Sequence, residues 1–172
     1  AAQKRGLSPG GDIMIHGQPN EIAEGYKVKG NTKTKERVIL REMRQKPGEP
    51  FNSKLARRSM QRVYNLGFFE DVNIKMNPGV DPNAVVMELD VTEKRTGSFG
   101  IGAGYSTSNG ILAELSLTEK NFLGRGQYVR ASVSKGITTD GKSGDSSYEL
   151  SFTEPYLFDR HLEGGFDVYQ RN

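Results

Sequence analysis

The sequence predicts two regions of different fold class: an α+β domain of order β-α-α-β-β over residues 20–95, and antiparallel strands over residues 96–172. Two observations predict this division. Apolar residues recur at helical spacing only before residue 96. After residue 96 they alternate with polar residues at every second position, which is the period of a strand.

The bulk composition excludes some classes of protein. The chain has 172 residues and no cysteine, which excludes disulfides and cysteine metal sites. It has no run of about 18 apolar residues, so a transmembrane helix is not expected. Transmembrane barrel strands give a much weaker signal and stay possible. The chain begins without Met or a signal-peptide pattern, so we expect a piece of a longer protein.

Charge is distributed unevenly along the chain. Residues 1–95 hold 17 Lys and Arg against 12 Asp and Glu, and residues 96–172 hold 7 against 9. A basic domain suggests nucleic-acid binding as one interpretation. We favour solvated helix surfaces, because the basic residues are interspersed with acidic ones along two amphipathic segments.

The first half of the domain is expected to contain one strand and one helix. Residues 1–19 are a frayed start or the end of a preceding domain, with a short apolar run at 12–16. Residues 25–29 alternate like a strand. A helix is expected over 35–45, with Thr34 as its N-cap and Pro47 after its end.

The second half is expected to contain one helix and two strands. Asn52 or Ser53 caps a helix that runs to Leu66, and Gly67 follows as its C′ residue. The side of this helix that is expected to face solvent carries three arginines: Arg57, Arg58 and Arg62. The first strand has an inward face of Phe68, Val72, Ile74 and Met76, and the second one of Val85, Met87, Leu89 and Val91. Together these faces suffice for one small core of two layers.

Five alternating segments of roughly 9–11 residues follow, which is the length that crosses a bilayer at the tilt of a barrel strand. Tight turns are expected at 108–110, 121–126 and 159–160, and a long polar loop at 137–147. Long loops on one side and short turns on the other are typical of an outer-membrane barrel. A soluble sandwich shows the same alternation. Five strands do not close a barrel, so we expect two open edges.

The first of these segments is unusual because glycines alternate with apolar residues. One face carries Phe99, Ile101, Ala103 and Tyr105, and the other carries Gly100, Gly102 and Gly104. Glycine weakens a strand, so three alternate glycines require a reason. Either they leave room for a side chain across a narrow lumen, or they make an edge strand pliable.

Four motifs resemble a known family. The motifs GNTKT at 30–34 and NLGFFEDV at 65–72 resemble a POTRA domain, the polypeptide-transport-associated module. The motifs NFLGRG at 121–126 and FTEPYLFD at 152–159 resemble the first barrel turns of BamA-type outer-membrane assembly factors. The resemblance covers about residues 20–170 and implies the last POTRA domain joined to the first five strands of a transmembrane β-barrel.

The family resemblance implies assembly and insertion of β-barrel proteins at the bacterial outer membrane, with the POTRA domain in the periplasm. It implies that a substrate strand pairs with the first barrel strand, which here comprises Gly97, Ser98, Phe99, Gly100, Ile101, Gly102, Ala103, Gly104 and Tyr105. It implies a periplasmic turn of Asn121, Phe122, Leu123, Gly124, Arg125 and Gly126. The implied partners are unfolded outer-membrane proteins, other POTRA domains, accessory lipoproteins and the lipid bilayer.

We expect no covalent chemistry, and no cofactor, metal, nucleotide or nucleic acid. The alternative within the superfamily is a pore that secretes a passenger protein, and a remoter one is a soluble adaptor with a sheet-forming tail. Residues 136–143 match the phosphate-loop pattern GxxxxGK[ST], but an alternating strand follows where that motif requires a helix. The carboxylates Glu149, Glu154, Asp159 and Glu163 lack metal spacing, and His16 has no second ligand nearby. His161 is expected to be exposed at a turn.

Overall fold

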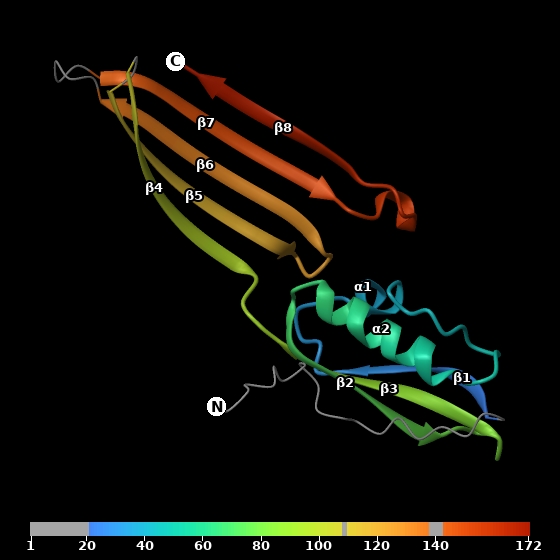
Figure 1. Cartoon of the computed structure of the whole chain (residues 1–172). Coiled ribbons are helices and arrows are strands. Elements are labelled where there is room, and N and C mark those ends of the chain that lie inside the picture. The colour runs from blue at the N-terminus through green and yellow to red at the C-terminus, as the bar shows by residue number, and fades with distance from the viewer. Residues whose placement is uncertain (1–20, 108–109, 138–142) are drawn as a thin grey trace, which may run out of the picture. The chain divides into compact units, whose positions relative to one another are not determined.

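The computed structural model describes residues 21–107, 110–137 and 143–172. The chain divides into two compact units at the bond between Arg95 and Thr96 (Figure 1). Each unit is described by itself. The expectations for residues 1–19, for His16 and for the turn at 108–109 lie outside the described residues.

The first unit is a three-stranded sheet with helices on one face (Figure 1). Its strands are β1 (Ile22–Lys29), β2 (Phe69–Pro78) and β3 (Ala84–Glu93), and its helices are α1 (Glu36–Leu40) and α2 (Ser53–Asn65). The strand order is β1-β3-β2. β1 runs parallel to β3, and the chain between them contains both helices, which gives the long connection that a parallel pair requires. β2 is antiparallel to β3. The predicted order β-α-α-β-β is confirmed.

The core of this unit lies between the sheet and the helices. The central strand contributes Met87 and Leu89, both fully buried, and α2 contributes Ala56 and Val63. A register shift in β2 between Phe69 and Asp71 changes the alternation at the start of that strand. Phe69 therefore faces inward together with Val72. The strand begins at Phe69 rather than at Phe68, although Phe68 is also buried.

Helix α2 forms as its local sequence predicts. The Oδ1 atom of Asn52 accepts hydrogen bonds from the N–H groups of Lys54 (3.0 Å) and Leu55 (3.4 Å), so Asn52 is the N-cap. Gly67 follows the helix with a φ of +75°. The solvent-facing side of α2 differs from the prediction in one respect. Arg62 is partly buried, and its Nη2 atom lies 2.6 Å from Oε2 of the buried Glu42.

Helix α1 departs from its prediction at both ends. It stops at Leu40 instead of residue 45: the N–H groups of Glu42 and Met43 donate to carbonyls only three residues back, and that of Arg44 donates to the hydroxyl of Ser59 (2.8 Å). The side chain of Gln45 donates to the carbonyl of Pro50 (3.1 Å) and accepts from the N–H of Asn52 (2.9 Å). The prediction of Thr34 as N-cap was wrong: the N-cap is Lys35, whose side chain makes no capping hydrogen bond.

Glu93 binds the loop that precedes α1. Its Oε2 accepts from the N–H groups of Thr32 (3.0 Å) and Lys33 (2.8 Å), and its Oε1 accepts from the N–H of Thr34 (2.6 Å). Burial alone would raise the pKa of this carboxyl, but the hydrogen bonds from residues 32–34 lower the pKa to about 2. The last residue of β3 thus anchors the loop before α1.

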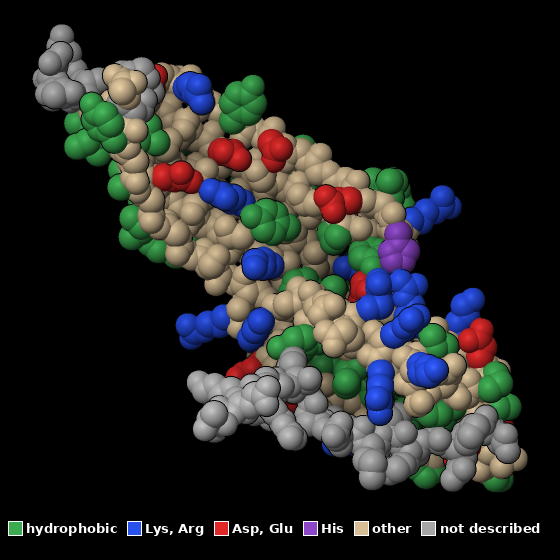
Figure 2. Space-filling view, in the orientation of Figure 1, with side chains coloured by type: hydrophobic (Ala, Val, Ile, Leu, Met, Phe, Trp, Pro, Cys, Tyr) green, Lys and Arg blue, Asp and Glu red, His purple; other side chains and the backbone are tan. Residues whose placement is uncertain are grey.

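The second unit is an antiparallel meander in the order β4-β5-β6-β7-β8 (Figure 1). Its strands are β4 (Gly97–Ser106), β5 (Gly110–Phe122), β6 (Gln127–Ile137), β7 (Ser143–Glu154) and β8 (Gly164–Arg171). The predicted five antiparallel strands are confirmed. Figure 2 shows acidic and basic side chains scattered over one face of this sheet.

The connection between β7 and β8 is longer than predicted. A tight turn at 159–160 was expected, but β7 ends at Glu154 and β8 begins at Gly164. Pro155 follows β7 directly and has no N–H group to continue the ladder. A short 3-10 helix, η1 (Leu157–Asp159), occupies the connection.

Removal of the Glu93 carboxylate tests its role as an anchor. Because its pKa is lowered, its stabilising contribution is complete above the ordinary value of 4.5 and is lost as the pH falls toward about 2. We expect Glu93→Gln to cost about 2 kcal/mol at neutral pH, as for a hydrogen bond to a charged group. Urea unfolding measures this cost, and the variant should lose the acid dependence. Unchanged amide exchange at Thr32–Thr34 in the variant would contradict the assignment.

Candidate functional site

The edge of β4 that faces away from β5 is the candidate functional site. β4 pairs with β5 over its whole length without a register shift, from Gly97 opposite Glu119 to Ser106 opposite Gly110. Among the described strands, β4 has this one neighbour. Its other side therefore presents a row of main-chain groups that another strand could pair with.

The register decides which residues present those groups. The carbonyl of Thr96 accepts from the N–H of Lys120 (3.3 Å), so Thr96 directs its main-chain groups toward β5. Main-chain groups alternate between the two sides of a strand. Those of the even-numbered residues thus point toward β5. Those that point toward the free edge belong to Gly97, Phe99, Ile101, Ala103 and Tyr105.

One face of the sheet is apolar and exposed. Rows of paired residues cross it, as in Phe99–Leu117–Ala131–Leu150–Val168. The exposed fractions of Phe99, Ile101 and Tyr105 are 61%, 76% and 75%. An apolar surface of this extent is not stable against water and marks a contact with lipid or protein.

The opposite face is polar, as the alternation predicts. A row across it is Gly100–Ser116–Ser132–Glu149–Tyr169. Arg130 pairs with Glu114 at 3.0 Å on this face and ties β5 to β6. On β4, glycines take the equivalent positions and contribute no side chain to this face.

The three glycines of β4 differ in the space around them. A Cβ atom at Gly100 would lie 2.5 Å from the hydroxyl of Ser116, which would have to move. At Gly102 it would lie 3.7 Å from the Cβ atom of Glu114, an ordinary contact, and at Gly104 it would meet nothing within 4 Å. Within this sheet, therefore, sterics require a glycine at neither 102 nor 104.

The turn at 121–126 is organised by a buried asparagine. Asn121 is 1% exposed, and its Oδ1 atom accepts from the N–H of Gly126 at 2.8 Å. Leu123, Gly124 and Gly126 have φ values of 54°, 69° and 74°. The glycines supply positive φ as predicted, and Leu123 does so as well. Phe122 is 38% exposed and Arg125 is exposed.

Sequence reasoning missed the residues that join the base of β4 to this turn. Thr96 is 7% exposed, and its hydroxyl donates to Oε1 of Glu119. The N–H of Asn121 donates to the same oxygen at 2.9 Å. A signal was present in the sequence: Glu119 continues the apolar row 111–117 at the same period, where a carboxylate is unusual.

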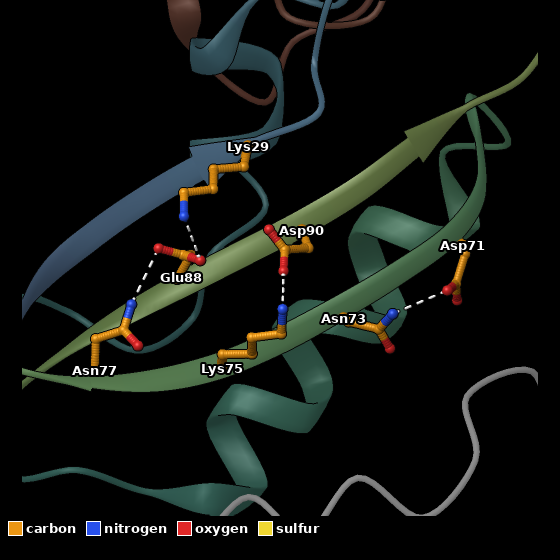
Figure 3. A network of polar contacts seen from close by, with 7 residues as sticks. All are labelled: Lys29, Asp71, Asn73, Lys75, Asn77, Glu88 and Asp90. Carbon is orange, nitrogen blue, oxygen red and sulfur yellow. Dashed lines mark hydrogen bonds and ion pairs between the residues drawn. The ribbon is translucent and has the colours of Figure 1, made fainter.

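On the first unit, the face of the sheet away from the helices is polar (Figure 3). Glu88 on the central strand is 6% exposed, and its oxygens bind Nζ of Lys29 (2.9 Å) and Nδ2 of Asn77 (3.0 Å). Nζ of Lys75 lies 2.6 Å from Asp90, whose hydrogen bond raises the pKa of Lys75. These pairs satisfy the charges of a solvated face and leave it without an apolar docking surface.

The helical side of the first unit is basic. Figure 2 shows Lys and Arg side chains gathered over its helices. One hollow is lined by Arg44, Leu55, Arg58, Gln61 and Arg62. Arg62 is already paired with Glu42, so the guanidinium groups of Arg44 and Arg58 and the amide of Gln61 are the groups that match a carboxylate or phosphate of an acidic partner.

Among the described residues, the other chemistry-bearing motifs form no site. Residues 138–142 of the phosphate-loop pattern lie outside the described residues, and strand β7 follows where that motif needs a helix. The exposed His161 packs against Tyr156 with tilted rings, whose centroids are 4.8 Å apart. Across the described ranges, no cluster of three His, Cys, Asp or Glu is arranged to hold a metal ion. No helix in those ranges is long and apolar enough to cross a membrane.

Two family models match the chain. Residues 23–94 match POTRA, described as a surface antigen variable number repeat, and residues 121–172 match the Omp85 superfamily domain. These matches coincide with the first unit and with the sheet from the end of β5 onward.

Named proteins match most of the chain. It is 32% identical over 161 residues to the outer membrane protein assembly factor BamA of Neisseria meningitidis, covering 92% of this chain and 19% of that protein. It is 34% identical over 142 residues to BamA of Nitratidesulfovibrio vulgaris, covering 83% of this chain and 17% of that protein. The crystal structure of Haemophilus ducreyi BamA lacking POTRA domains 1–3 matches with a TM-score of 0.77 and 26% identity, over 88% of this chain and 27% of that one. The chain thus spans about a fifth of the length of these curated relatives.

Proposed function

The chain is a homologue of the BamA-type outer-membrane assembly factors, with a POTRA domain ahead of an Omp85-type sheet, and on this premise we propose that it assembles and inserts β-barrel proteins. Like those relatives, it is an outer-membrane protein with its POTRA domain in the periplasm. In the proposed mechanism, β4 is the template on which a substrate strand is added by main-chain pairing.

The free edge of β4 is the observation that carries this proposal. The main-chain groups of five residues point to that edge, and every polypeptide except at proline offers matching groups. Pairing of this kind is indifferent to the sequence of the incoming strand. A template for many different barrel proteins needs that tolerance, and it needs no covalent chemistry.

The two faces of the sheet support a position in the bilayer. The apolar face would meet lipid, and the face with Gly100, Gly102 and Gly104 would meet the barrel interior. β4 has 10 residues, which at barrel tilt is enough to cross the hydrocarbon core. A strand added to β4 would continue both faces, since its side chains alternate at the same period.

The basic hollow of the POTRA domain is the surface that we assign to accessory partners. Arg58 is exposed, and Arg44 and Arg62 line the same hollow, so an acidic segment of a lipoprotein or of another POTRA domain fits it. The outer sheet face suits this role less, because Lys29, Glu88, Lys75 and Asp90 are already paired among themselves.

Disulfide crosslinking tests the template role. With cysteine at Ala103, we expect crosslinks to cysteines in the terminal strand of a barrel protein during its folding, for substrates of unrelated sequence. Cysteine at Ala113 is the matched control, because that residue lies on the same face of β5 but has a strand on both sides. Crosslinks that line only the interior face, with a secreted passenger, would support the export pore in place of the assembly factor.

Glycine substitution tests whether pliability of β4 matters. A Cβ atom at Gly104 meets nothing within 4 Å, so we expect Gly104→Val to leave the sheet folded. A β-branched residue stiffens the strand, and barrel assembly should fall several-fold. Gly100→Val should disturb the sheet more, because it displaces the Ser116 hydroxyl. Loss of folding in Gly104→Val would favour the alternative that the glycines leave room inside the barrel.

Charge reversal tests the partner surface. Arg58→Glu places a carboxylate in the hollow, and we expect co-purification of accessory lipoproteins to fall, most clearly at low salt. Arg57→Glu is the control, since Arg57 is equally exposed on α2 but does not line the hollow. Equal effects of the two variants would indicate a general charge effect and contradict the assignment.

A further inference from the structure

The alternation of β4 does not by itself specify its register against β5. Shifting β4 by two residues keeps the glycines on the polar face and the apolar residues on the other, because Gly100, Gly102 and Gly104 repeat at that interval. Glycine-rich strands are prone to such slippage. The segment between the strands, Thr-Ser-Asn at 107–109, is of residue types that turns of several lengths accept. The register of β4 against β5 therefore needs another determinant, at the N-terminal end of β4.

Glu119 provides a contact that exists in one register. The Oε1 atom of Glu119 accepts from the Thr96 hydroxyl, and the residue opposite Glu119 is Gly97. A Cβ atom at Gly97 would lie 3.3 Å from Oε2 of Glu119, so the glycine leaves space for the carboxylate. A shift of two residues displaces Thr96 along the strand by about 7 Å and breaks this hydrogen bond.

The turn also holds this carboxylate. The N–H of Asn121 donates to Oε1 of Glu119 at 2.9 Å, and the side chain of Asn121 accepts from Gly126 at 2.8 Å. Asn121 is 1% exposed, so the turn gives Glu119 a fixed position. Thr96 precedes β4 directly and comes three residues after β3. The contact thus anchors the point where the chain enters the sheet.

We propose that Glu119 is a positioning residue that fixes the register of β4 against β5. The same contact then fixes the position along the sheet at which the free edge of β4 meets an incoming strand. The functional part of this inference rests on the proposed template role. In the anchored register, the residues from Gly97 to Tyr105 that point outward keep one place along β5. In a slipped register, the main-chain groups of the free edge would be displaced by two residues along β5. A substrate strand that paired with them would then be out of register with the rest of the sheet.

Paired cysteines can report the register, since the chain has no cysteine of its own. Ala103→Cys with Ala113→Cys joins residues that are directly opposite in the observed register. Ile101→Cys with Ala113→Cys joins residues that become opposite after a slip of two. In the observed register these two lie on a diagonal of about 7–8 Å, too far for a disulfide.

In the membrane-inserted protein, we expect Glu119→Ala to raise the slipped crosslink relative to the native one by about tenfold, as for the loss of one charge-assisted hydrogen bond. Glu119→Gln keeps an Oε1 acceptor but removes the charge, and should shift the ratio less than Glu119→Ala does. Thr96→Val removes the donor while leaving the carboxylate bound to Asn121, and should shift the ratio in the same direction. Glu114→Ala is the control, because that carboxylate of β5 binds Arg130 on β6.

An unchanged crosslink ratio in Glu119→Ala, with the native crosslink still formed, would overturn the inference. If Glu119→Ala forms neither crosslink because it does not fold, Thr96→Val decides: no shift in its ratio overturns the inference as well. These internal crosslinks require no substrate. Failure of the template role, seen as absent crosslinks between wild-type β4 and a folding barrel, is therefore distinguishable from failure of the register role.

Discussion

The structure of the second unit depends on one constraint: main-chain groups in an apolar medium must find hydrogen-bond partners. A backbone N–H or C=O group without a partner is costly in hydrocarbon, so a strand edge there must be paired. β4 is paired on one side by β5, and the groups of Gly97, Phe99, Ile101, Ala103 and Tyr105 point to the other. In the proposed mechanism, this same cost favours the pairing of an incoming strand with the edge. The placement of the edge then matters, and this is the role that we propose for Glu119.

Both units contain strands with one apolar face, but that face is buried in the first unit and exposed in the second. In the first unit, helix α2 covers the apolar face of the sheet, so Met87 and Leu89 are fully buried. In the second, residues of the same kind, such as Ile101 and Leu117, are more than half exposed. An exposed apolar face is stable only against a nonaqueous neighbour. The helices thus account for the burial of the apolar face in the first unit, and the second unit has no such cover over the apolar face of its described strands.

The sequence predicted the elements whose determinants are local. Helix α2 is correct at both ends because Asn52 and Gly67 act within a few residues of themselves. The errors came from distant partners. Thr34 does not cap α1, because Glu93, distant in sequence, binds the loop before that helix. Helix α1 ends early, and the N–H of Arg44 donates to the hydroxyl of Ser59 on α2 instead of to a helical carbonyl. In the candidate site, the edge strand and the turn at 121–126 were predicted, but Thr96 and Glu119 were not.

By itself the sequence determined the type and order of the elements and which residues share a face, because periods of 3.6 and 2 residues are local properties. It also located the glycine-rich strand. Only the tertiary structure decided the order β1-β3-β2, the register that sets Gly97 opposite Glu119, and the direction of the main-chain groups along the free edge. The physical reason is that a period of two is unchanged by a slip of two. Pairing partners are therefore selected by contacts such as Thr96 with Glu119, between residues far apart in the chain.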